Sequence, residues 1–314
     1  MSDANAVEGV PFPGNDNYRA SRSERQRTLR SPGLAFALSL NCLVMVIDFH
    51  THVFPPWAIQ GREELLRTDP TFAQLYGNPR SRMATAPDLL ASMERAGVEA
   101  SVVLGFAWRD QELCRRHNDY LLEWATRSRG RLVPFCTVNP SAAGAWQEVE
   151  RCAAAGARGL GELRPDDQGW ELAGATGKEL AEAARHLQLI LLFHVSEPVG
   201  HRYPGKEGLS LTDFYRFAVD NPDLTVVGAH LGGGLPFFAP MPEVAEVCRR
   251  LYFDTAAVPL LYTTAAYDLV DHDRLLFGSD YPLLGQGRAL SSLPDRALAH
   301  RWSENAARLL GCGQ

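Results

Sequence analysis

The stretch VIDFHTH at residues 46–52 decides how this chain is expected to fold. An apolar run that ends in His50-Thr51-His52 predicts a strand, and alternate side chains of a strand point to the same side. The two imidazoles therefore lie together at the strand end and form half of a metal site. Imidazole and carboxylate ligands suit Zn, Mn, Fe or Ni without any thiolate.

Beyond this strand the chain alternates short apolar runs with helix-period stretches, the pattern of a parallel sheet covered by helices. Strands are predicted at 43–49, 98–104, 131–138, 157–162, 188–194, 223–230, 250–254 and 274–280. Helices are predicted at 87–96, 111–129, 141–155, 176–187, 209–220, 241–249, 258–270 and, as a final pair, near 292–311. Such units close most naturally into a (β/α)8 TIM barrel, a fold of about 250 residues. We expect one barrel domain at 43–314, with an insert at 54–86 after strand one.

The N-terminal residues differ from the rest in composition. Residues 1–34 are polar and lack helical or strand periodicity, so we expect residues 1–42 to form a disordered or poorly structured extension. The apolar run at 35–47 is too short for a transmembrane helix. A secretory signal is not expected, because cleavage after this run would remove the H-x-H strand. Whether residues 1–44 belong to the functional protein stays open.

Composition and charge narrow the classes of partner. The 314 residues are 46% hydrophobic and 22% charged, which is ordinary for a globular protein. The formal net charge of −6, without a basic run beyond the N-terminal extension, argues against nucleic acids and anionic membranes. The cysteines are scattered and are expected to be reduced, which favours the cytoplasm. They are Cys42, Cys114, Cys136, Cys152, Cys248 and Cys312.

Metal-capable side chains also end the later predicted strands. After His50 and His52 at strand one, they are Glu162, His194, His230, Asp254 and Asp280 at strands four to eight. Active sites of barrel enzymes lie at the C-terminal ends of the strands, so all are expected to meet at one mouth. A lone histidine would more often be a satisfied core residue. Glu162 suits either a metal contact or a supporting role, and Asp254 suits either a turn or a hydrogen-bond partner.

The remaining histidines and the insert offer weaker signals. The sequence predicts that four histidines lie on the surface: His117, His186, His272 and His300. His201 follows strand five in a loop that should overhang the mouth, where it could contact substrate. In the insert, Trp57 together with Phe72 and Tyr76 could line an apolar or aromatic pocket, or could only pack the insert onto the barrel.

The order of several motifs resembles the amidohydrolase superfamily. The motifs are VIDFHTHVFP, GLGELRP, LLFHVSEP, VVGAHLGG, YFDTAA, RLLFGSDYP and the closing ENAARLLG. Within the superfamily the chain resembles the amidohydrolase-related branch that contains aminocarboxymuconate-semialdehyde decarboxylase, over residues 45–312. The resemblance implies a metal-dependent (β/α)8 enzyme without an organic cofactor. Such enzymes hydrolyse amides, esters, lactones or C–C bonds, or decarboxylate aromatic and enol-type acids.

The same resemblance implies a ligand set. His50, His52, His194 and Asp280 would hold a divalent metal, with His230 beside it as an acid/base or carbonyl-polarising group. Many binuclear relatives place a carbamylated lysine where this chain has Glu162, a choice similar to the TatD-like nucleases, in which the glutamate bridges two metals. One metal or two therefore stays open, and we expect one ion, zinc.

A hydrolase of a small, carboxylated substrate is the first functional expectation. Coordination lowers the pKa of water to about 7, Asp280 would move the proton to the leaving group, and His230 would stabilise the oxyanion. Arg164 would anchor a substrate carboxylate or form a structural salt bridge. The alternative is a decarboxylase that protonates the carbon losing CO2 with the same groups.

Two further classes are less expected. The acidic balance counts against a TatD-like phosphodiesterase. A metal-binding barrel without catalysis would need a filled coordination sphere. The expected partner is a small-molecule substrate, and a homodimer stays open.

Overall fold

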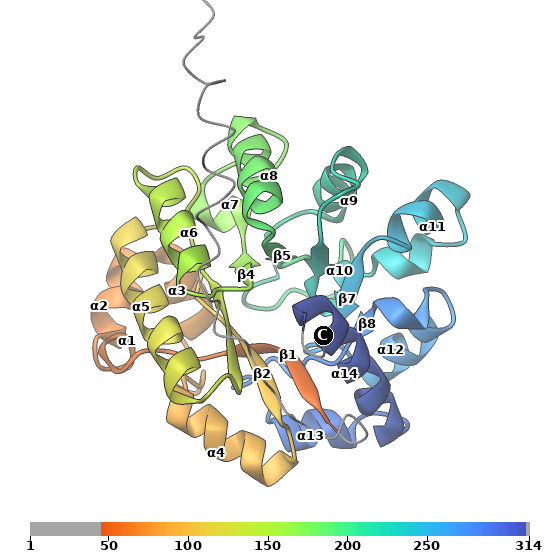
Figure 1. Ribbon diagram of the computed structural model, residues 1–314, viewed down its shortest axis with the longest axis horizontal. Coiled ribbons are helices and arrows are strands. Elements are labelled where there is room, and N and C mark those ends of the chain that lie inside the picture. The colour runs from red at the N-terminus through yellow and green to blue at the C-terminus, as the bar shows by residue number, and fades with distance from the viewer. Residues whose placement is uncertain (1–44, 207, 312–314) are drawn as a thin grey trace, which may run out of the picture. The chain divides into compact units, whose positions relative to one another are not determined.

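The structure, a computed structural model, describes residues 45–206 and 208–311 (Figure 1). The predicted extension at 1–42 and the first two residues of the predicted first strand lie outside the described residues. No helix in the described part of the chain is both long and apolar enough to cross a membrane. Four of the six cysteines fall in this part, and all four are buried free thiols: Cys114, Cys136, Cys152 and Cys248.

Eight parallel strands pair in chain order and form the sheet. They are β1 (Ile47–His52), β2 (Ala100–Leu104), β3 (Leu132–Cys136), β4 (Gly159–Leu163), β5 (Ile190–Phe193), β6 (Val226–Gly228), β7 (Tyr252–Asp254) and β8 (Leu275–Leu276). The sheet closes on itself, because the Phe49 amide donates to the Phe277 carbonyl at 2.7 Å and the His52 amide donates to the Tyr281 carbonyl at 2.7 Å. The predicted (β/α)8 barrel is therefore confirmed.

Several strands are shorter than predicted, above all β6 and β8. The backbone of His230 turns into the left-handed region just after β6, with φ 57°, and Asp280 does the same after β8, with φ 61°. A left-handed residue interrupts extended backbone and is uncommon outside glycine. The residues predicted as the ends of strands six and eight therefore lie in tight turns at the mouth.

Helices follow most of the strands and surround the barrel (Figure 1). Before β5 they are α1 (Pro56–Gln60), α2 (Arg62–Thr68), α3 (Pro70–Tyr76), α4 (Ala86–Ala96), α5 (Gln111–Arg127), α6 (Ala145–Ala154), α7 (Pro165–Gln168) and α8 (Ala175–Leu187). After β5 they are α9 (Leu211–Asp220), α10 (Ala229–Gly232), the 3-10 helix η3 (Leu235–Phe238), α11 (Pro242–Cys248), α12 (Leu260–Tyr267), the 3-10 helix η4 (His272–Arg274), α13 (Gln286–Ser291) and α14 (Arg296–Leu310). The insert at 54–86 contributes α1, α2 and α3.

Local sequence sets the helix boundaries. Thr85 and Asp88 form a capping box that begins α4, and Gly97 ends this helix with φ 70°. The Asp110 side chain accepts hydrogen bonds from the amides of Glu112 and Leu113 and so begins α5. The start of the helix predicted at 141–155 is wrong, because this helix, α6, begins only at Ala145, after Gly144 at φ 81°.

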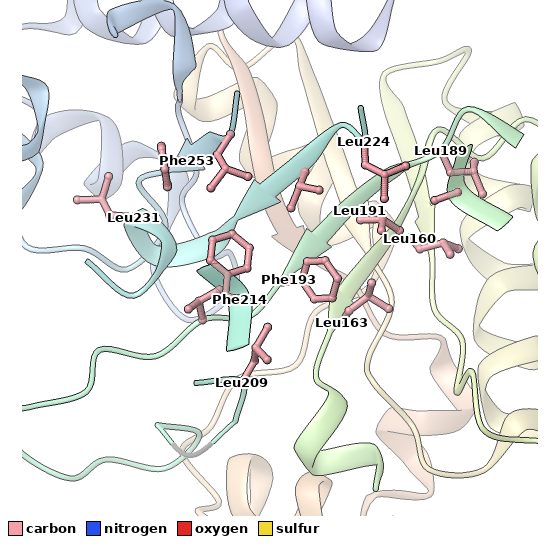
Figure 2. Packing of buried hydrophobic residues seen from close by; sticks show 14 of the residues in the cluster. Leu160, Leu163, Leu189, Leu191, Phe193, Leu209, Phe214, Leu224, Leu231 and Phe253 are labelled. Atoms are coloured by element: carbon pink, nitrogen blue, oxygen red, sulfur yellow. The ribbon is translucent and has the colours of Figure 1, made fainter. Parts of the chain in front are cut away.

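The core has two layers that follow from the alternation of side chains along each strand. In β5, Ile190 and Leu192 point into the barrel, whereas Leu191 and Phe193 point outward toward the helices. Figure 2 shows the outer layer, where Phe193 lies near Phe214 of α9 with ring centroids 6.1 Å apart. These side chains are almost fully buried. The outer layer fixes the strands and, with them, the positions of the residues at their C-terminal ends.

A third apolar cluster joins the insert to the barrel. Phe72 of α3 stacks on Trp108 with centroids 5.3 Å apart, and Phe106 packs against both rings. The prediction that His117 lies on the surface is wrong, because the insert covers this face of α5 and leaves His117 with no exposed surface. Its Nε2 donates to the Val53 carbonyl at 2.8 Å and its Nδ1 accepts from Trp108 Nε1 at 3.0 Å. His117 therefore holds the chain just before the insert and the residue Trp108 on which the insert packs.

Candidate metal centre

Six of the residues singled out in the sequence meet at the C-terminal mouth of the barrel. They are His50 and His52 of β1, Glu162 of β4, His194 after β5, His230 in α10 after β6, and Asp280 after β8. His50 Nε2 lies 3.1 Å from His52 Nε2. Asp280 Oδ1 lies 3.8 Å from His50 Nε2 and 3.6 Å from His52 Nε2. This half of the centre thus places two imidazoles and a carboxylate around one point.

Glu162 lies between the two halves of the centre. Its Oε1 is 2.7 Å from His194 Nδ1 and 3.3 Å from His230 Nε2. The same carboxylate reaches the first half, with Oε1 4.0 Å from His50 Nε2 and Oε2 3.7 Å from His52 Nε2. His194 Nδ1 and His230 Nε2 are themselves 3.2 Å apart. Glu162 therefore has the position of either a ligand to one ion or a bridge between two.

The outward nitrogens of three imidazoles are held by acceptors. His50 Nδ1 donates to Asp254 Oδ2 at 2.9 Å, His230 Nδ1 to the Ala256 carbonyl at 2.8 Å, and His194 Nε2 to the Gly205 carbonyl at 3.0 Å. In the neutral ring, a proton on each outward nitrogen leaves the inward nitrogen with a lone pair aimed at its neighbours. Facing lone pairs repel unless a cation lies among them, and metal-binding histidines are oriented in this way. The residues present therefore fit a divalent cation of the imidazole- and carboxylate-binding type.

Burial and charge shift the pKa values of these groups in opposite directions. Burial alone would lower the pKa of His50, but the Asp254 carboxylate raises it to about 10. Burial, and then the nearby Arg164 charge, lower the pKa of His194 to about 4. Burial would raise the pKa of Glu162, yet His194 holds it well below its usual range. Buried carboxylates therefore stay ionised beside imidazoles, which makes the centre attractive to a cation.

The backbone adds strain at two of the six residues. His230 and Asp280 both have left-handed φ values, 57° and 61°, which cost a non-glycine residue free energy. Each turn directs a side chain toward the centre from a strand that would otherwise carry it away. The Asp280 amide also donates to the His50 carbonyl at 2.9 Å. The strain is thus compensated by closure of the barrel between β8 and β1.

Two buried aspartates support the histidines. The sequence left open whether Asp254 belongs to a turn or is a hydrogen-bond partner. Its Oδ2 accepts a hydrogen bond from His50 Nδ1, and its Oδ1 accepts hydrogen bonds from the amides of His230 and Ala256 at 3.0 and 3.1 Å. Asp48 escaped the sequence reasoning. Its carboxylate accepts from the Ser279 amide at 2.9 Å and from the Ser279 hydroxyl at 2.6 Å. A carboxylate inside the apolar start of the D-x-H-x-H strand is the signal that could have found it.

The three predicted substrate contacts have different surroundings. Arg164 is only 4% exposed, and it donates through Nε to Asp167 Oδ2 at 2.5 Å and through Nη2 to the Gly205 carbonyl at 3.0 Å. Trp57 is half-buried beneath the Arg116 guanidinium, whose carbon lies 4.2 Å from the ring centroid. His201 is exposed in the loop after β5.

The insert places one more polar group near the centre. Tyr76 ends α3, and its ring stacks on Phe72 with centroids 4.9 Å apart. Burial raises the pKa of the Tyr76 hydroxyl, and the charges of Asp280 and Glu162 raise it further. The hydroxyl thus stays neutral and lies within electrostatic reach of the centre. The fold and the site together define a metal-dependent barrel enzyme.

Comparison with known proteins agrees with this class. The amidohydrolase family profile matches residues 47–312. The chain therefore belongs to the amidohydrolase family, as the motifs predicted. No curated protein matches the sequence.

Solved structures of low sequence identity share the fold. 5-Carboxyvanillate decarboxylase from Sphingomonas paucimobilis is 17% identical with a TM-score of 0.67, over 85% of this chain and 99% of that protein. The enzyme of the same name from Novosphingobium aromaticivorans, with bound manganese and a nitrobenzoic acid, is 14% identical with a TM-score of 0.70, over 86% and 97%. 2,6-Dihydroxybenzoate decarboxylase from Rhizobium is 16% identical with a TM-score of 0.64, over 86% and 99%.

Proposed function

We propose that this protein is a metal-dependent, non-oxidative decarboxylase of an aromatic or enol-type carboxylic acid. The observation that carries the proposal is the cluster of four imidazoles and two carboxylates at the mouth, beside an insert rich in aromatic side chains. Similar folds belong to proteins named as decarboxylases of hydroxylated aromatic acids. This support favours decarboxylation over the hydrolysis that the sequence first suggested.

His50, His52, His194 and Asp280 would hold the ion, with Glu162 as a further ligand. When bound, a divalent ion supplies Lewis-acid stabilisation of the negative charge on the substrate. Zinc was the expectation from the sequence, and manganese is bound by a protein of similar fold. Both ions suit this donor set. We propose one resident ion per chain.

Asp280 would deliver the proton on which the reaction depends. Its carboxylate would take a proton from solvent and pass it to the ring or enol carbon that carries the substrate carboxylate. The bond between this carbon and the carboxylate then breaks, its electron pair returns to the conjugated system, and CO2 leaves. Asp280 is left as a carboxylate, the form in which it would hold the ion. His230 Nε2 faces the centre and, when protonated, would donate a hydrogen bond to a substrate oxygen. Burial lowers the pKa of His230, but the hydrogen bond with Glu162 and the charge of this carboxylate raise it above its usual value.

The insert would bind the body of the substrate, and Arg164 would act on a loop. Tyr76, which packs on the buried ring of Phe72, would offer aromatic surface near the centre. Because Arg164 and His194 both donate to the Gly205 carbonyl, we assign Arg164 to holding this loop over the mouth. A substrate carboxylate would then be bound at the metal centre.

A panel of acids tests the reaction. Enzyme loaded with Mn or with Zn is incubated with hydroxylated benzoic acids, including 2,6-dihydroxybenzoate and 5-carboxyvanillate, and with amides, esters and lactones. Decarboxylation predicts CO2 release in equal amount to product, and in D2O one deuterium at the carbon that lost CO2. Hydrolysis of the amides, esters or lactones without any decarboxylation would refute the proposal and support the hydrolase.

Variants test the roles of the carboxylates. Asp280→Asn should lower kcat by about 10²–10⁴-fold, the usual contribution of a positioned acid, whereas Asp220→Asn at the exposed end of α9 should leave kcat unchanged. Elemental mass spectrometry of Glu162→Gln tests the ion count. One metal per chain that survives this substitution places Glu162 outside the ligand set, and two metals falling to one or none would make it a bridge.

A further inference from the structure

A hollow of about 550 Å³ lies apart from the metal centre, between α4 and the segment that leads from Tyr281 into α13. None of the six residues of the centre lines it. The two helices lie side by side (Figure 1). Small-molecule sites in proteins typically measure roughly 300–1,000 Å³. The hollow is therefore large enough for a ligand the size of a small aromatic acid.

Three arginines surround this hollow, namely Arg82, Arg95 and Arg288. All three are exposed, and none of their guanidinium groups forms an ion pair or hydrogen bond with another residue among those the structure describes. Among the described residues, Asp88 is the only acidic one in the lining, and its carboxylate is already bound by the amide and hydroxyl of Thr85 at 2.9 and 2.6 Å. The rim is thus cationic in a chain whose formal net charge is −6. Such a concentration of unpaired guanidinium groups attracts an anion.

The walls between the arginines are largely apolar. Ala84, Ala91 and Pro282 line them together with the half-buried ring of Tyr281. Burial and then the Asp88 carboxylate raise the pKa of the Tyr281 hydroxyl, and Arg95 and Arg82 oppose them. A ligand that uses both features has an anionic group and a small apolar body. An organic carboxylate fits this description better than an inorganic anion.

Two wall residues connect the hollow to the metal centre. The Tyr281 carbonyl accepts a hydrogen bond from the His52 amide at 2.7 Å. Gln286 is fully buried and donates through Nε2 to Asp48 Oδ2 at 2.9 Å, and Asp48 in turn accepts the Ser279 amide, one residue before Asp280. A displacement of either wall residue therefore moves backbone that carries His52 or Asp280.

We propose that this hollow binds a small organic carboxylate and that its occupancy changes the affinity of the centre for its metal. The inference does not require that the enzyme be a decarboxylase. Coupling between two sites is reciprocal, so metal binding must change the affinity for the carboxylate by the same factor. Benzoate serves as the probe of an anion with an apolar body, and inorganic phosphate as the probe of charge alone.

Calorimetric titration of benzoate into the full chain, after a chelator has removed the metal, measures binding at the hollow without a contribution from the ion. We expect benzoate to bind once per chain, and Arg95→Ala/Arg288→Ala to weaken this binding at least about tenfold, the effect of losing one or two charge-assisted hydrogen bonds. Arg216→Ala, an exposed arginine on α9, should leave it unchanged. Phosphate should bind more weakly than benzoate. Equal benzoate binding by wild type and the double variant would overturn the proposal.

Metal affinity supplies the second readout. Saturating benzoate should shift the manganese affinity of the wild type more than that of the double variant. Any direct contact between benzoate and the ion affects both proteins equally, so the difference between the two shifts reports on the hollow. An equal shift in both proteins would refute the coupling. A double variant that changes its oligomeric state on gel filtration, with no change in benzoate binding, would make the hollow an interface and refute the ligand site. Circular dichroism confirms that the compared proteins are folded.

Discussion

Replacing Asp254 by asparagine should reverse the tautomer of His50 without disturbing the surrounding backbone. Asp254 is fully buried, and its Oδ2 accepts the proton of His50 Nδ1 at 2.9 Å. Asparagine keeps an oxygen for the amides of His230 and Ala256 but presents N–H donors to His50. The imidazole proton must then move to Nε2, which faces the metal centre. The nitrogen that should bind the ion becomes protonated.

The magnitude follows from the loss of an oriented ligand. Removing the partner that orients a metal-binding histidine typically costs about 10–100-fold in metal affinity, which corresponds to about 1.4–2.7 kcal/mol. Competition against a chromophoric chelator measures this affinity for zinc and for manganese. Asp220→Asn is the matched control, because this aspartate is exposed at the end of α9. A folded Asp254→Asn protein with wild-type metal affinity would refute the assignment of His50 Nε2 as a ligand.

Three further predictions concern stability. Burial lowers the pKa of His117 from 6.5 to about 4, so between these pH values only the unfolded chain binds the proton, and stability falls as the pH drops. Urea unfolding at pH 7 and at pH 4 measures how much unfolding free energy is lost between these pH values, and His117→Gln should reduce this loss by up to about 3 kcal/mol. An unchanged loss would contradict the burial of a neutral imidazole. Removing the metal with a chelator should lower the unfolding free energy, and metal at about 100 times its Kd should restore about 2.7 kcal/mol; a thermal midpoint that ignores metal would argue against a site in the folded state. Phe193→Ala should cost about 3–5 kcal/mol, whereas Val199→Ala, with Val199 73% exposed, should change the urea midpoint little; similar small effects for both would contradict the packing of the outer layer.

Much of the fold could be predicted because each strand and helix has a recognisable local sequence pattern. The apolar runs have the length and spacing of strands, and capping residues such as Asp110 mark the helices between them. The convergence of Glu162, His194 and Asp280 followed from one rule, that the strands of a barrel end at the same mouth. Strand lengths were less predictable. The left-handed turns at His230 and Asp280 depend on barrel closure, which no local pattern contains.

Residue roles that depend on partners far apart in the chain were harder to predict. His117 shows this, because its helix alone is consistent with a surface position. Only the tertiary fold, which brings the Val53 carbonyl to its Nε2 and covers it with the insert, makes it a core residue. Asp48 is another case, since its partner Ser279 lies 231 positions away.

The sequence by itself determined the fold class, the family and the set of metal-capable side chains. These features depend on periodicity and on residue type, which are properties of the linear sequence. Only the tertiary structure decided which nitrogen of each histidine faces the centre, that Arg164 bonds Asp167 and the Gly205 carbonyl, and that arginines from α4 and α13 meet around one hollow. The physical reason is that hydrogen bonds and charge act over a few ångströms in space. Residues distant in sequence acquire their roles only when folding brings them within that range.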